Sequence, residues 1–377
     1  MTRLCEPEQA IVERAAQFAR EGVAPNAARW ERERRIGREA IMAAAEIGLT
    51  RLQVPLEHGG LDYSFGCKAQ VAEVLAMADF GFTMSLINTH NVAAKLAREA
   101  PPAIAAPWVA ELIAGRRIGC TALTEPGAGS DFSAIETRAA RSDDGWRLDG
   151  SKAWITNASE ADLIVLYAQT EAGSGARGIA GFVIDATRPG FVREEAFALA
   201  GQHAIGAGGF RLDGYRAHPG EMLQPPGQAF KSALVSINGA RTYIAAMCCG
   251  MVAQALRIAA EFGARRQTFG RPLDQHQGWR WRLADAATDL AAARHLVADA
   301  SARIDAREDA QLASAQAKLF ATRMADRHLP ALLQAMGAEG LREDYPFGRH
   351  LIGARVAGFV DGSSEMLLER IAAGIKA

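Results

Sequence analysis

The sequence has few cysteines and no spacing that would close a disulfide framework or bind a metal. Its five cysteines are scattered over 377 residues without a Cys-x-x-Cys pair, and its eight histidines show no His-Glu-x-x-His pattern. An odd, scattered set favours free thiols in a reducing compartment. No structural metal is expected.

The chain also lacks a strong charge of either sign. Its formal net charge is −1 and it has no basic run, so we expect no nucleic-acid partner. Residues 1–8 carry no apolar signal core, and no apolar run reaches the roughly 18 residues that span a bilayer. These absences predict a soluble, cytoplasmic protein with no membrane partner.

Hydrophobic residues make up 49% of the chain, enough for a large core and two or three domains. Helical spacing occurs at 10–19, 37–48, 66–78, 84–98 and 102–114. Strand patterns follow at 146–149, 163–167, 181–185 and 209–212, with turns expected at 143–145 and 149–150. Two long helical patterns then cover 233–263 and 278–307.

The pattern therefore predicts a mostly α protein with a central β domain. We expect an N-terminal α-helical domain over 1–117, a middle β domain over 118–224 and a C-terminal helical domain over 225–377. Neither a Gly-x-Gly-x-x-Gly run after a strand nor a P-loop occurs, which disfavours a nicotinamide dehydrogenase or a nucleotide triphosphatase.

Two segments in the middle region combine hydroxyls with glycines or an aromatic. Residues 124–131 read Thr-Glu-Pro-Gly-Ala-Gly-Ser-Asp, a turn whose N–H groups can approach an anion or a cofactor edge; a plain surface turn explains it equally well. Residues 152–157 read Lys-Ala-Trp-Ile-Thr-Asn. Trp154 and Thr156 are expected on one strand face, where they can contact a planar cofactor, although a core tryptophan is the alternative.

Three more segments lie in the C-terminal region. Residues 265–273 read Arg-Arg-Gln-Thr-Phe-Gly-Arg-Pro-Leu, followed by Gln277; they can hold a phosphate and an adenine, or form a solvated basic surface. Residues 334–340 read Gln-Ala-Met-Gly-Ala-Glu-Gly, and residues 360–366 read Val-Asp-Gly-Ser-Ser-Glu-Met. Alone, Asp-Gly-Ser is typical of a turn.

Together, and in this order, these segments closely resemble the acyl-CoA dehydrogenase family over essentially the whole chain. The runs at 124–131, 154–157 and 266–277 are highly specific to that family. The resemblance implies an N-terminal helical domain, a β-barrel-like middle domain and a C-terminal four-helix bundle. It also implies an FAD cofactor, a homotetramer built as a dimer of dimers and a place in fatty acid metabolism.

The resemblance assigns roles to individual residues of this sequence. The expected cofactor-binding residues are Leu123, Thr124, Gly129, Ser130, Trp154, Thr156, Arg266, Phe269, Gln277, Gln334, Gly337 and Ser363. Of these, Arg266, Phe269 and Gln277 are expected at the FAD of a neighbouring subunit. The expected substrate-binding residues are Ser130, Asn238, Arg241 and Gly362.

The family's chemistry joins two events. A carboxylate, here Asp361, removes the α proton of an acyl thioester, and a hydride passes from the β carbon to the flavin. Hydrogen bonds to the thioester carbonyl stabilise the developing enolate, and burial raises the proton affinity of the base. The implied partners are an acyl-CoA or acyl-carrier-protein thioester and an electron-transfer flavoprotein.

The base segment departs from the family pattern, which usually reads Glu-Gly-Thr where this chain has Asp361-Gly362-Ser363. Aspartate is shorter by one carbon–carbon bond, roughly 1.5 Å, and a misplacement of about 1 Å can lower a rate about 100-fold. Either Asp361 is a weak base or no base, or the substrate is bulkier, for example branched or ring-bearing.

Other departures surround this segment. The position that carries the base in some relatives is Ala240, and the family's usual aspartate nearby is Asn238, so contacts to the pantetheine arm are open. Arg241 can assist the thioester tail or pair with a carboxylate. Ile352-Gly353 and Val360 replace the usual Arg-Asp pair and tyrosine, and Glu365 is expected to face away or to cap a helix.

Two alternatives to acyl-thioester dehydrogenation stay open on the sequence. A nitroalkane-oxidase-like flavin oxidase would use Asp361 on a more acidic α proton and pass electrons to oxygen. A non-catalytic, FAD-bound scaffold is the third reading.

Overall fold

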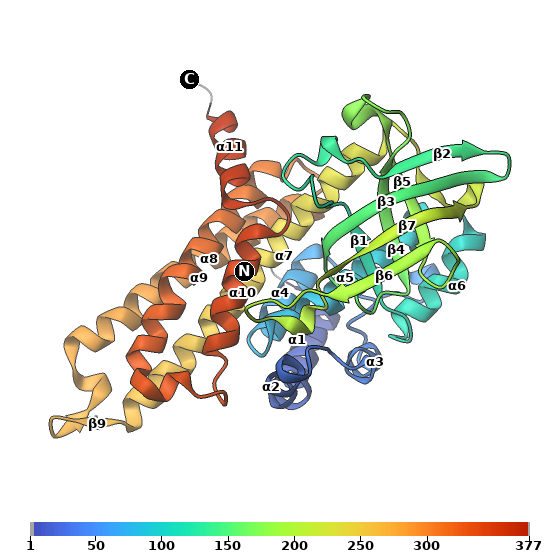
Figure 1. Ribbon diagram of the computed structural model, residues 1–377. Helices are drawn as coiled ribbons and strands as arrows, with labels where there is room; N and C mark the ends of the chain where they lie inside the picture. Colours follow the sequence, from blue (N-terminus) through green and yellow to red (C-terminus); the bar gives the residue numbers. More distant parts are fainter. Residues whose placement is uncertain (1–3, 376–377) are drawn as a thin grey trace.

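The computed structural model describes residues 4–375. Residues 1–3 of the segment without a signal core and residues 376–377 of the expected C-terminal domain lie outside the described part. Helices come first, a sheet follows, and long helices complete the chain (Figure 1). This order confirms the predicted mostly α fold with a central β domain.

Six α-helices precede the sheet within the described residues. They are α1 (Glu6–Phe18), α2 (Ala24–Glu33), α3 (Arg38–Glu46), α4 (Phe65–Ala76), α5 (Phe80–Glu99) and α6 (Pro102–Ile113). Side-chain caps set two of their starts: Ser64 accepts a hydrogen bond from the Cys67 N–H, and Asp79 accepts one from the Phe82 N–H. Such caps satisfy backbone N–H groups that have no partner inside the helix, so α4 and α5 begin at defined residues.

The middle region is one eight-stranded sheet in the order β6-β7-β3-β2-β4-β5-β8, with β1 parallel to β4. The strands are β1 (Gly119–Ala122), β2 (Arg138–Ser142), β3 (Gly145–Ile155), β4 (Leu163–Gln169), β5 (Ile179–Asp185), β6 (Phe191–Ala196), β7 (Gly208–Ala217) and β8 (Met222–Gln224). Every residue of β4 is buried, as expected of a central strand that is covered on both faces.

One of the two expected turns is wrong. Gly145 pairs with Ser142 across the β2–β3 hairpin, which confirms the turn at 143–145. Gly150 instead lies inside β3, where the register with β7 shifts. Its φ is +145°, and a Cβ there would stand 2.6 Å from the Thr137 Cα. This glycine therefore permits a bulge and a close approach of two backbones, not a chain reversal.

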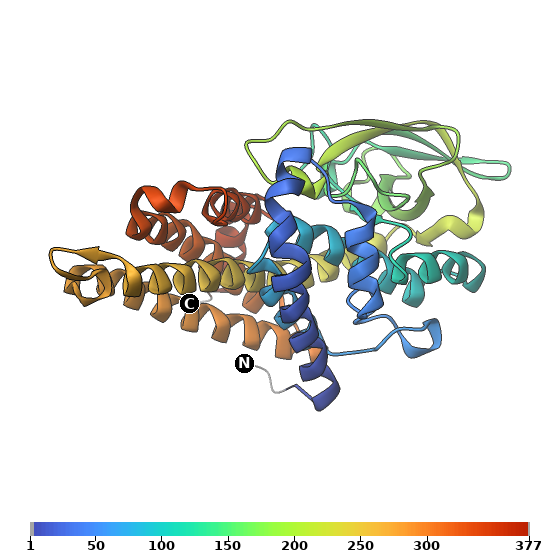
Figure 2. The same ribbon diagram turned by 90° about the horizontal axis from the view of Figure 1, so that it is seen from below.

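The C-terminal region consists of long helices and one small hairpin. They are α7 (Ala229–Arg265), β9 (Gln267–Thr268), β10 (Arg271–Pro272), α8 (Gln277–Asp305), α9 (Gln311–Met336), α10 (Phe347–Phe359) and α11 (Ser364–Gly374). Helices α7, α8 and α9 run side by side, and the hairpin lies at their far end from the sheet (Figures 1 and 2). Many alanines in their shared core allow the helices to pack closely.

Helix α7 corrects the expectation that no segment is long and apolar enough to span a bilayer. By length and composition α7 passes that test, but 72% of its most apolar window is buried inside the protein. Helix α7 packs between α4, α8 and α9. The apolar composition of α7 is therefore accounted for by core packing.

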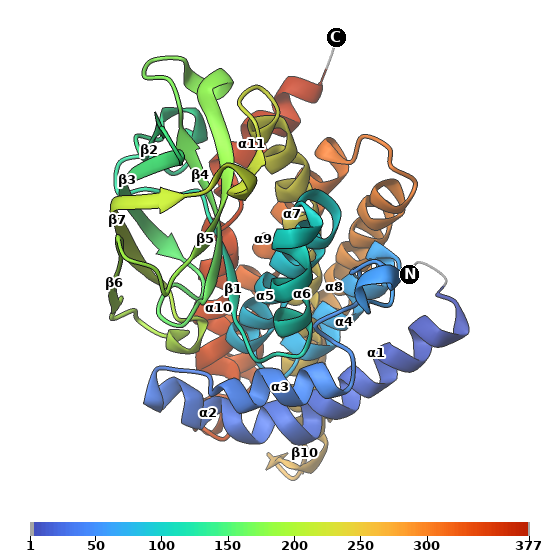
Figure 3. The ribbon, with the colours of Figure 1, turned by 90° about the vertical axis from the view of Figure 1, so that its right-hand side faces the viewer.

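The segment between β6 and β7 holds the sheet against α10. Gln202 donates a hydrogen bond to the Arg349 carbonyl (2.6 Å), and a Cβ on Gly201 would stand 3.1 Å from Ile352. Figure 3 shows the sheet as a layer beside the helices. This contact fixes the sheet relative to the helix that ends just before Asp361.

Candidate active site

Asp361 lies in the turn between α10 and α11, and two cations hold the backbone of that turn. Lys318 of α9 donates to the carbonyls of Val360 and Gly362, the latter at 2.6 Å. Arg241 of α7 donates through Nε to the carbonyl of Asp361 itself (3.0 Å). Three successive carbonyls are thus bound by side chains from two other helices.

The backbone at Asp361 is left-handed, with a φ of +52°. Few residues adopt this region, although aspartate tolerates it better than most. A strained residue persists when its surroundings over-determine it, and such residues cluster at functional sites. The cation-bound carbonyls supply that constraint here.

The Asp361 carboxylate itself has no hydrogen-bond donor among residues 4–375. Burial raises its pKa, and the charges of Lys318 and Arg241 oppose that rise. Burial also lowers the pKa of Lys318 to about 8. A carboxylate with raised proton affinity and no competing donor has the properties of a general base.

The predicted substrate residues of the helical region come together around this turn. Arg241 Nη1 donates to Asn238 Oδ1 (3.3 Å), and a Cβ on Gly362 would stand 3.1 Å from Arg241 Nη2. Arg241 forms no ion pair with a carboxylate among the described residues. Its alternative role as a carboxylate partner is therefore wrong, because it binds backbone and amide oxygens instead.

A second group forms where the loop at 123–131 meets β3. Lys152 is 1% exposed; its ammonium donates to the Leu123 carbonyl (2.9 Å) and pairs with Glu125 (2.8 Å). The Ala153 N–H donates to the Thr124 carbonyl (3.1 Å). A buried ion pair and a backbone hydrogen bond thus fix the loop beside Trp154.

Trp154 does not follow the strand alternation that the sequence predicts. Its φ is +62°, the register with β7 shifts between Lys152 and Ile155, and Thr156 lies in the turn after β3. The expectation that Trp154 and Thr156 share one strand face is therefore wrong. A core tryptophan is excluded as well, because the Trp154 side chain is 61% exposed and packs on Phe197.

The residues of this second group fit a planar cofactor with polar edges. The hydroxyls of Thr124, Ser130 and Thr156 form no hydrogen bond within residues 4–375, and none of the three residues is fully buried. Gly129 is exposed in the same loop. An exposed indole beside open hydroxyls suits stacking on a ring system combined with hydrogen bonds to its edge.

A third group lies far from Asp361. It comprises the predicted cofactor residues Arg266, Phe269, Gln277, Gln334 and Gly337, all of them exposed. The Trp279 indole donates to the Ala335 carbonyl (3.0 Å) and so joins the start of α8 to the end of α9. Along α7, Arg241 and the last helical residue, Arg265, are about 36 Å apart at about 1.5 Å per residue, so one chain does not bring Arg266 and its neighbours to Asp361.

Ser363 and Glu365 lie at the start of α11. Ser363 is its N-cap residue, and a hydrogen bond to Ser363 lowers the pKa of the exposed Glu365. As expected, Glu365 interacts locally at the start of α11.

Sequence reasoning missed Lys318. It is fully buried in the middle of α9, between Ala317 and Leu319. A lone lysine on an apolar helix face is the signal that could have identified it, because buried lysines are rare unless they are paired.

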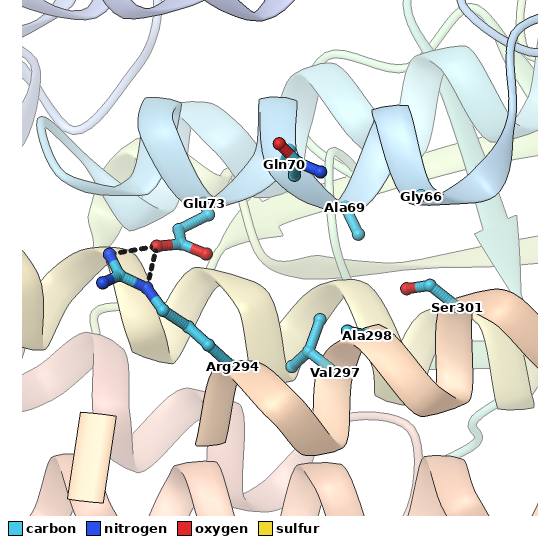
Figure 4. Close-up of a pocket in the computed structure, with 8 residues that line it drawn as sticks. All are labelled: Gly66, Ala69, Gln70, Glu73, Arg294, Val297, Ala298 and Ser301. Atoms are coloured by element: carbon cyan, nitrogen blue, oxygen red, sulfur yellow. Dashed lines mark hydrogen bonds and ion pairs between the residues drawn. The ribbon is translucent and has the colours of Figure 1, made fainter. Parts of the chain in front are cut away.

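A separate hollow lies between α4 and α8 (Figure 4). It is lined by Glu73 and Arg294, which form an ion pair of 2.5 Å. This hollow shares no lining residue with the groups above. Within residues 4–375, no cluster of His, Cys, Asp or Glu side chains could hold a metal ion.

The chain matches the family models of the acyl-CoA dehydrogenase N-terminal domain over residues 6–116, the middle domain over 120–215 and the C-terminal domain over 227–376. It is 31% identical to the mitochondrial short-chain specific acyl-CoA dehydrogenase of Bos taurus over 365 residues. This matched region covers 96% of this chain and 88% of that protein.

Solved structures share the fold of this chain over nearly its whole length. Butyryl-CoA dehydrogenase from Megasphaera elsdenii superposes with a TM-score of 0.95 at 28% identity and covers 99% of each chain. A glutaryl-coenzyme A dehydrogenase in complex with glutaryl-CoA gives a TM-score of 0.94 at 27% identity and covers 100% of this chain and 97% of that one.

Fold, site and relatives together define an FAD-dependent oxidoreductase that acts on CH–CH groups. The chain belongs to the acyl-CoA dehydrogenase family.

Proposed function

We propose that this protein introduces a double bond between the α and β carbons of an acyl-CoA thioester, with Asp361 as the base. The observation that carries the proposal is the Asp361 carboxylate, which has a raised pKa, no hydrogen-bond donor and a backbone held by Lys318 and Arg241. Ala240 cannot ionise, so the other position that carries the base in some relatives is empty of a carboxylate.

In this mechanism the Asp361 carboxylate takes the α proton of the thioester as the α–β double bond forms. Bound FAD supplies the acceptor for the hydride that leaves the β carbon. The Asp361 N–H hydrogen-bonds the thioester carbonyl and stabilises the negative charge that develops on its oxygen. Lys318 and Arg241 hold the turn, so the base and this N–H keep their relative positions during proton transfer.

Cofactor binding in this proposal uses residues of two chains. Leu123, Thr124, Gly129, Ser130, Trp154, Thr156 and Ser363 bind the FAD of their own chain, and Ser130 also contacts the substrate. Arg266, Phe269, Gln277, Gln334 and Gly337 bind the FAD of a neighbouring copy within a homotetramer. The distance along α7 between Arg241, which binds the Asp361 carbonyl, and the end of the helix before Arg266 supports this division. A ligand shared between subunits stabilises only the assembled state.

The proposal also covers the acyl group, the carrier of the thioester and the electron acceptor. Because aspartate reaches less far than glutamate, we expect branched or otherwise bulky acyl groups to be accepted. The thioester is carried by coenzyme A in this proposal, with an acyl-carrier protein as the alternative carrier. An electron-transfer flavoprotein takes the electrons.

A nitroalkane-oxidase-like activity is the second candidate, and the short side chain of Asp361 is the observation that favours it. The two candidates separate when the purified yellow protein is mixed anaerobically with panels of acyl-CoA esters and nitroalkanes. Bleaching of the flavin by an acyl-CoA supports dehydrogenation. Bleaching by nitroalkanes alone would refute dehydrogenation, and no bleaching by either panel would support a non-catalytic scaffold.

A further inference from the structure

Lys68 is a buried cation beside the candidate active site that the proposed mechanism does not use. It lies on α4 and is 4% exposed. Its ammonium donates to Asn91 Oδ1 (2.6 Å) and lies 5.4 Å and 5.2 Å from the ring centroids of Phe65 and Tyr243. One lysine thus meets side chains from α4, α5 and α7.

Lys68 has no carboxylate partner in the part of the chain that the structure describes. Within residues 4–375 its ammonium forms no ion pair with a carboxylate, and only one hydrogen-bond partner, Asn91, is present for its three donors. Burial lowers the pKa of Lys68 to about 7, and the charge of Arg98 adds to that effect. The aromatic faces of Phe65 and Tyr243 offset only part of the hydration that the ammonium loses on burial. Buried charges in proteins are usually paired with an opposite charge, and Lys68 lacks such a partner among the described residues.

His90, which precedes Asn91 on α5, supplies no negative charge to Lys68. His90 is fully buried, its Nε2 has no partner, and burial together with the charge of Lys68 lowers its pKa to about 3. Lys68 is therefore the only charge-bearing group of a cluster that otherwise consists of the neutral Asn91, Tyr243 and His90. An anion that enters the cluster would meet a cationic donor and no carboxylate within the cluster.

Hydrogen bonds join Lys68, Asn91 and Tyr243, and the charge of Asp361 acts on Tyr243. Asn91 Nδ2 donates to the hydroxyl oxygen of Tyr243 (3.3 Å). Burial raises the pKa of Tyr243, and the charge of Asp361 raises it further, so the phenol is close enough to respond to the base. Tyr243 is two residues beyond Arg241, which binds the Asp361 carbonyl. Asn91 is only half-buried, so the cluster is not sealed.

The hollow of Figure 4 is a different place. Its lining residues on α4 are Gly66, Ala69, Gln70 and Glu73. At 100° per residue, Lys68 points from the opposite side of that helix. The carboxylate of Glu73 is consequently paired with Arg294 and does not serve Lys68.

We propose that Lys68, with Asn91 and Tyr243, binds a carboxylate at the far end of the substrate's acyl chain, so that the preferred substrates are thioesters of dicarboxylic acids. This inference rests on the proposed acyl-CoA dehydrogenation and narrows its substrate class. The unpaired ammonium supplies the charge, Asn91 and Tyr243 supply polar neighbours, and a bound carboxylate replaces the missing counter-ion. An uncharged acyl chain would leave Lys68 unpaired.

The test uses the FAD-loaded enzyme and measures the rate of anaerobic flavin reduction at limiting substrate. Succinyl-, glutaryl- and adipyl-CoA are each compared with the monocarboxylic acyl-CoA of the same chain length. We expect at least one dicarboxylic thioester to react faster than its uncharged partner. In Lys68→Met this ratio should fall on the order of 100-fold, the usual effect of removing one partner of a buried ion pair.

Lys231→Met is the matched control, because Lys231 is an exposed lysine on α7; it should leave the ratio unchanged. Asn91→Leu gives a second variant, expected to lower the ratio less than Lys68→Met, should the latter fail to fold. Faster oxidation of every monocarboxylic partner by the unmodified enzyme would overturn the inference and leave the proposed function intact. An equal loss for both substrate types in Lys68→Met would also overturn it. Flavin reduction by nitroalkanes alone would refute both this inference and the proposed acyl-CoA dehydrogenation.

Discussion

Replacing Lys318 by methionine tests how the protein sets the proton affinity of its base. Methionine preserves much of the side-chain volume in the core of α9 but removes the ammonium. The carbonyls of Val360 and Gly362 then lose their donor, and Asp361 loses one of the two positive charges that lower its pKa. We expect the pKa of Asp361 to rise further.

The size of this effect follows from the position of the ammonium. Lys318 binds the carbonyls on both sides of Asp361, so its charge lies roughly 7 Å from the carboxylate, about one residue plus one hydrogen bond. With an effective dielectric constant near 20, a unit charge at that distance is worth about 2.4 kcal/mol. This energy corresponds to about 1.7 pH units on the acidic limb of the rate profile.

The assay is kcat/KM for an acyl-CoA between pH 5 and pH 7, where Lys318 stays mostly protonated because its pKa is about 8. Asp361 must be ionised to accept a proton, so kcat/KM rises as pH increases through its pKa. In Lys318→Met this rise should move to higher pH. Lys231→Met, which changes an exposed lysine, should leave the profile in place. An unchanged acidic limb in Lys318→Met, in a folded and FAD-loaded protein, would refute the reasoning.

Three further predictions concern the cofactor region. Lys152→Met should destabilise the protein by about 3–5 kcal/mol, because it leaves Glu125 buried and unpaired, and adding Glu125→Gln should restore part of the loss in a denaturant titration; equal midpoints for the single and double variants would contradict this. Trp154→Ala should weaken FAD retention during gel filtration without lowering the melting temperature of the apoprotein, since the side chain is 61% exposed; a large loss of apoprotein stability would argue against a cofactor role. Phe269→Ser should lower FAD content and shift the mass in solution toward smaller species together, because Phe269 is 97% exposed in a single chain; full FAD content in a monomer would oppose a shared site.

Local sequence patterns were sufficient for the order of helices and sheet. Helical spacing located α4, α5 and α6 within a few residues, because amphipathic periodicity and capping side chains act within one turn. The family motifs likewise identified Asp361, Trp154 and Arg241 as residues of interest. These signals are short in sequence, so they need no knowledge of the tertiary structure.

Contacts between distant segments were not accessible in the same way. Lys318 lies 42 and 44 residues from the two carbonyls that it binds, and nothing near Asp361 in the sequence indicates it. Lys68 meets Tyr243 only because α4 packs on α7. Tertiary packing brings these cations to the active site, and a lone lysine in an apolar helix was the only trace that they left.

Irregular backbone conformation was a second feature that the sequence pattern did not predict. Asp149-Gly150 has the composition of a hairpin turn but forms a bulge, because β7 continues alongside β3 past this point. Trp154 departs from strand alternation because its φ is positive. Period-two reasoning assumes a regular strand, and the site lies at an irregular one.

The most direct test of the central claim is the rate of anaerobic flavin reduction in Asp361→Asn, an isosteric change that removes the base. If Asp361 takes the α proton, the rate with butyryl-CoA should fall about 100- to 10,000-fold. FAD content should stay unchanged. At neutral pH the stability should not decrease, because burial raises the pKa of Asp361 and the charged carboxylate therefore disfavours the folded state above its unfolded pKa. Flavin reduction by Asp361→Asn at the rate of the unmodified protein would contradict the assignment of Asp361 as the base.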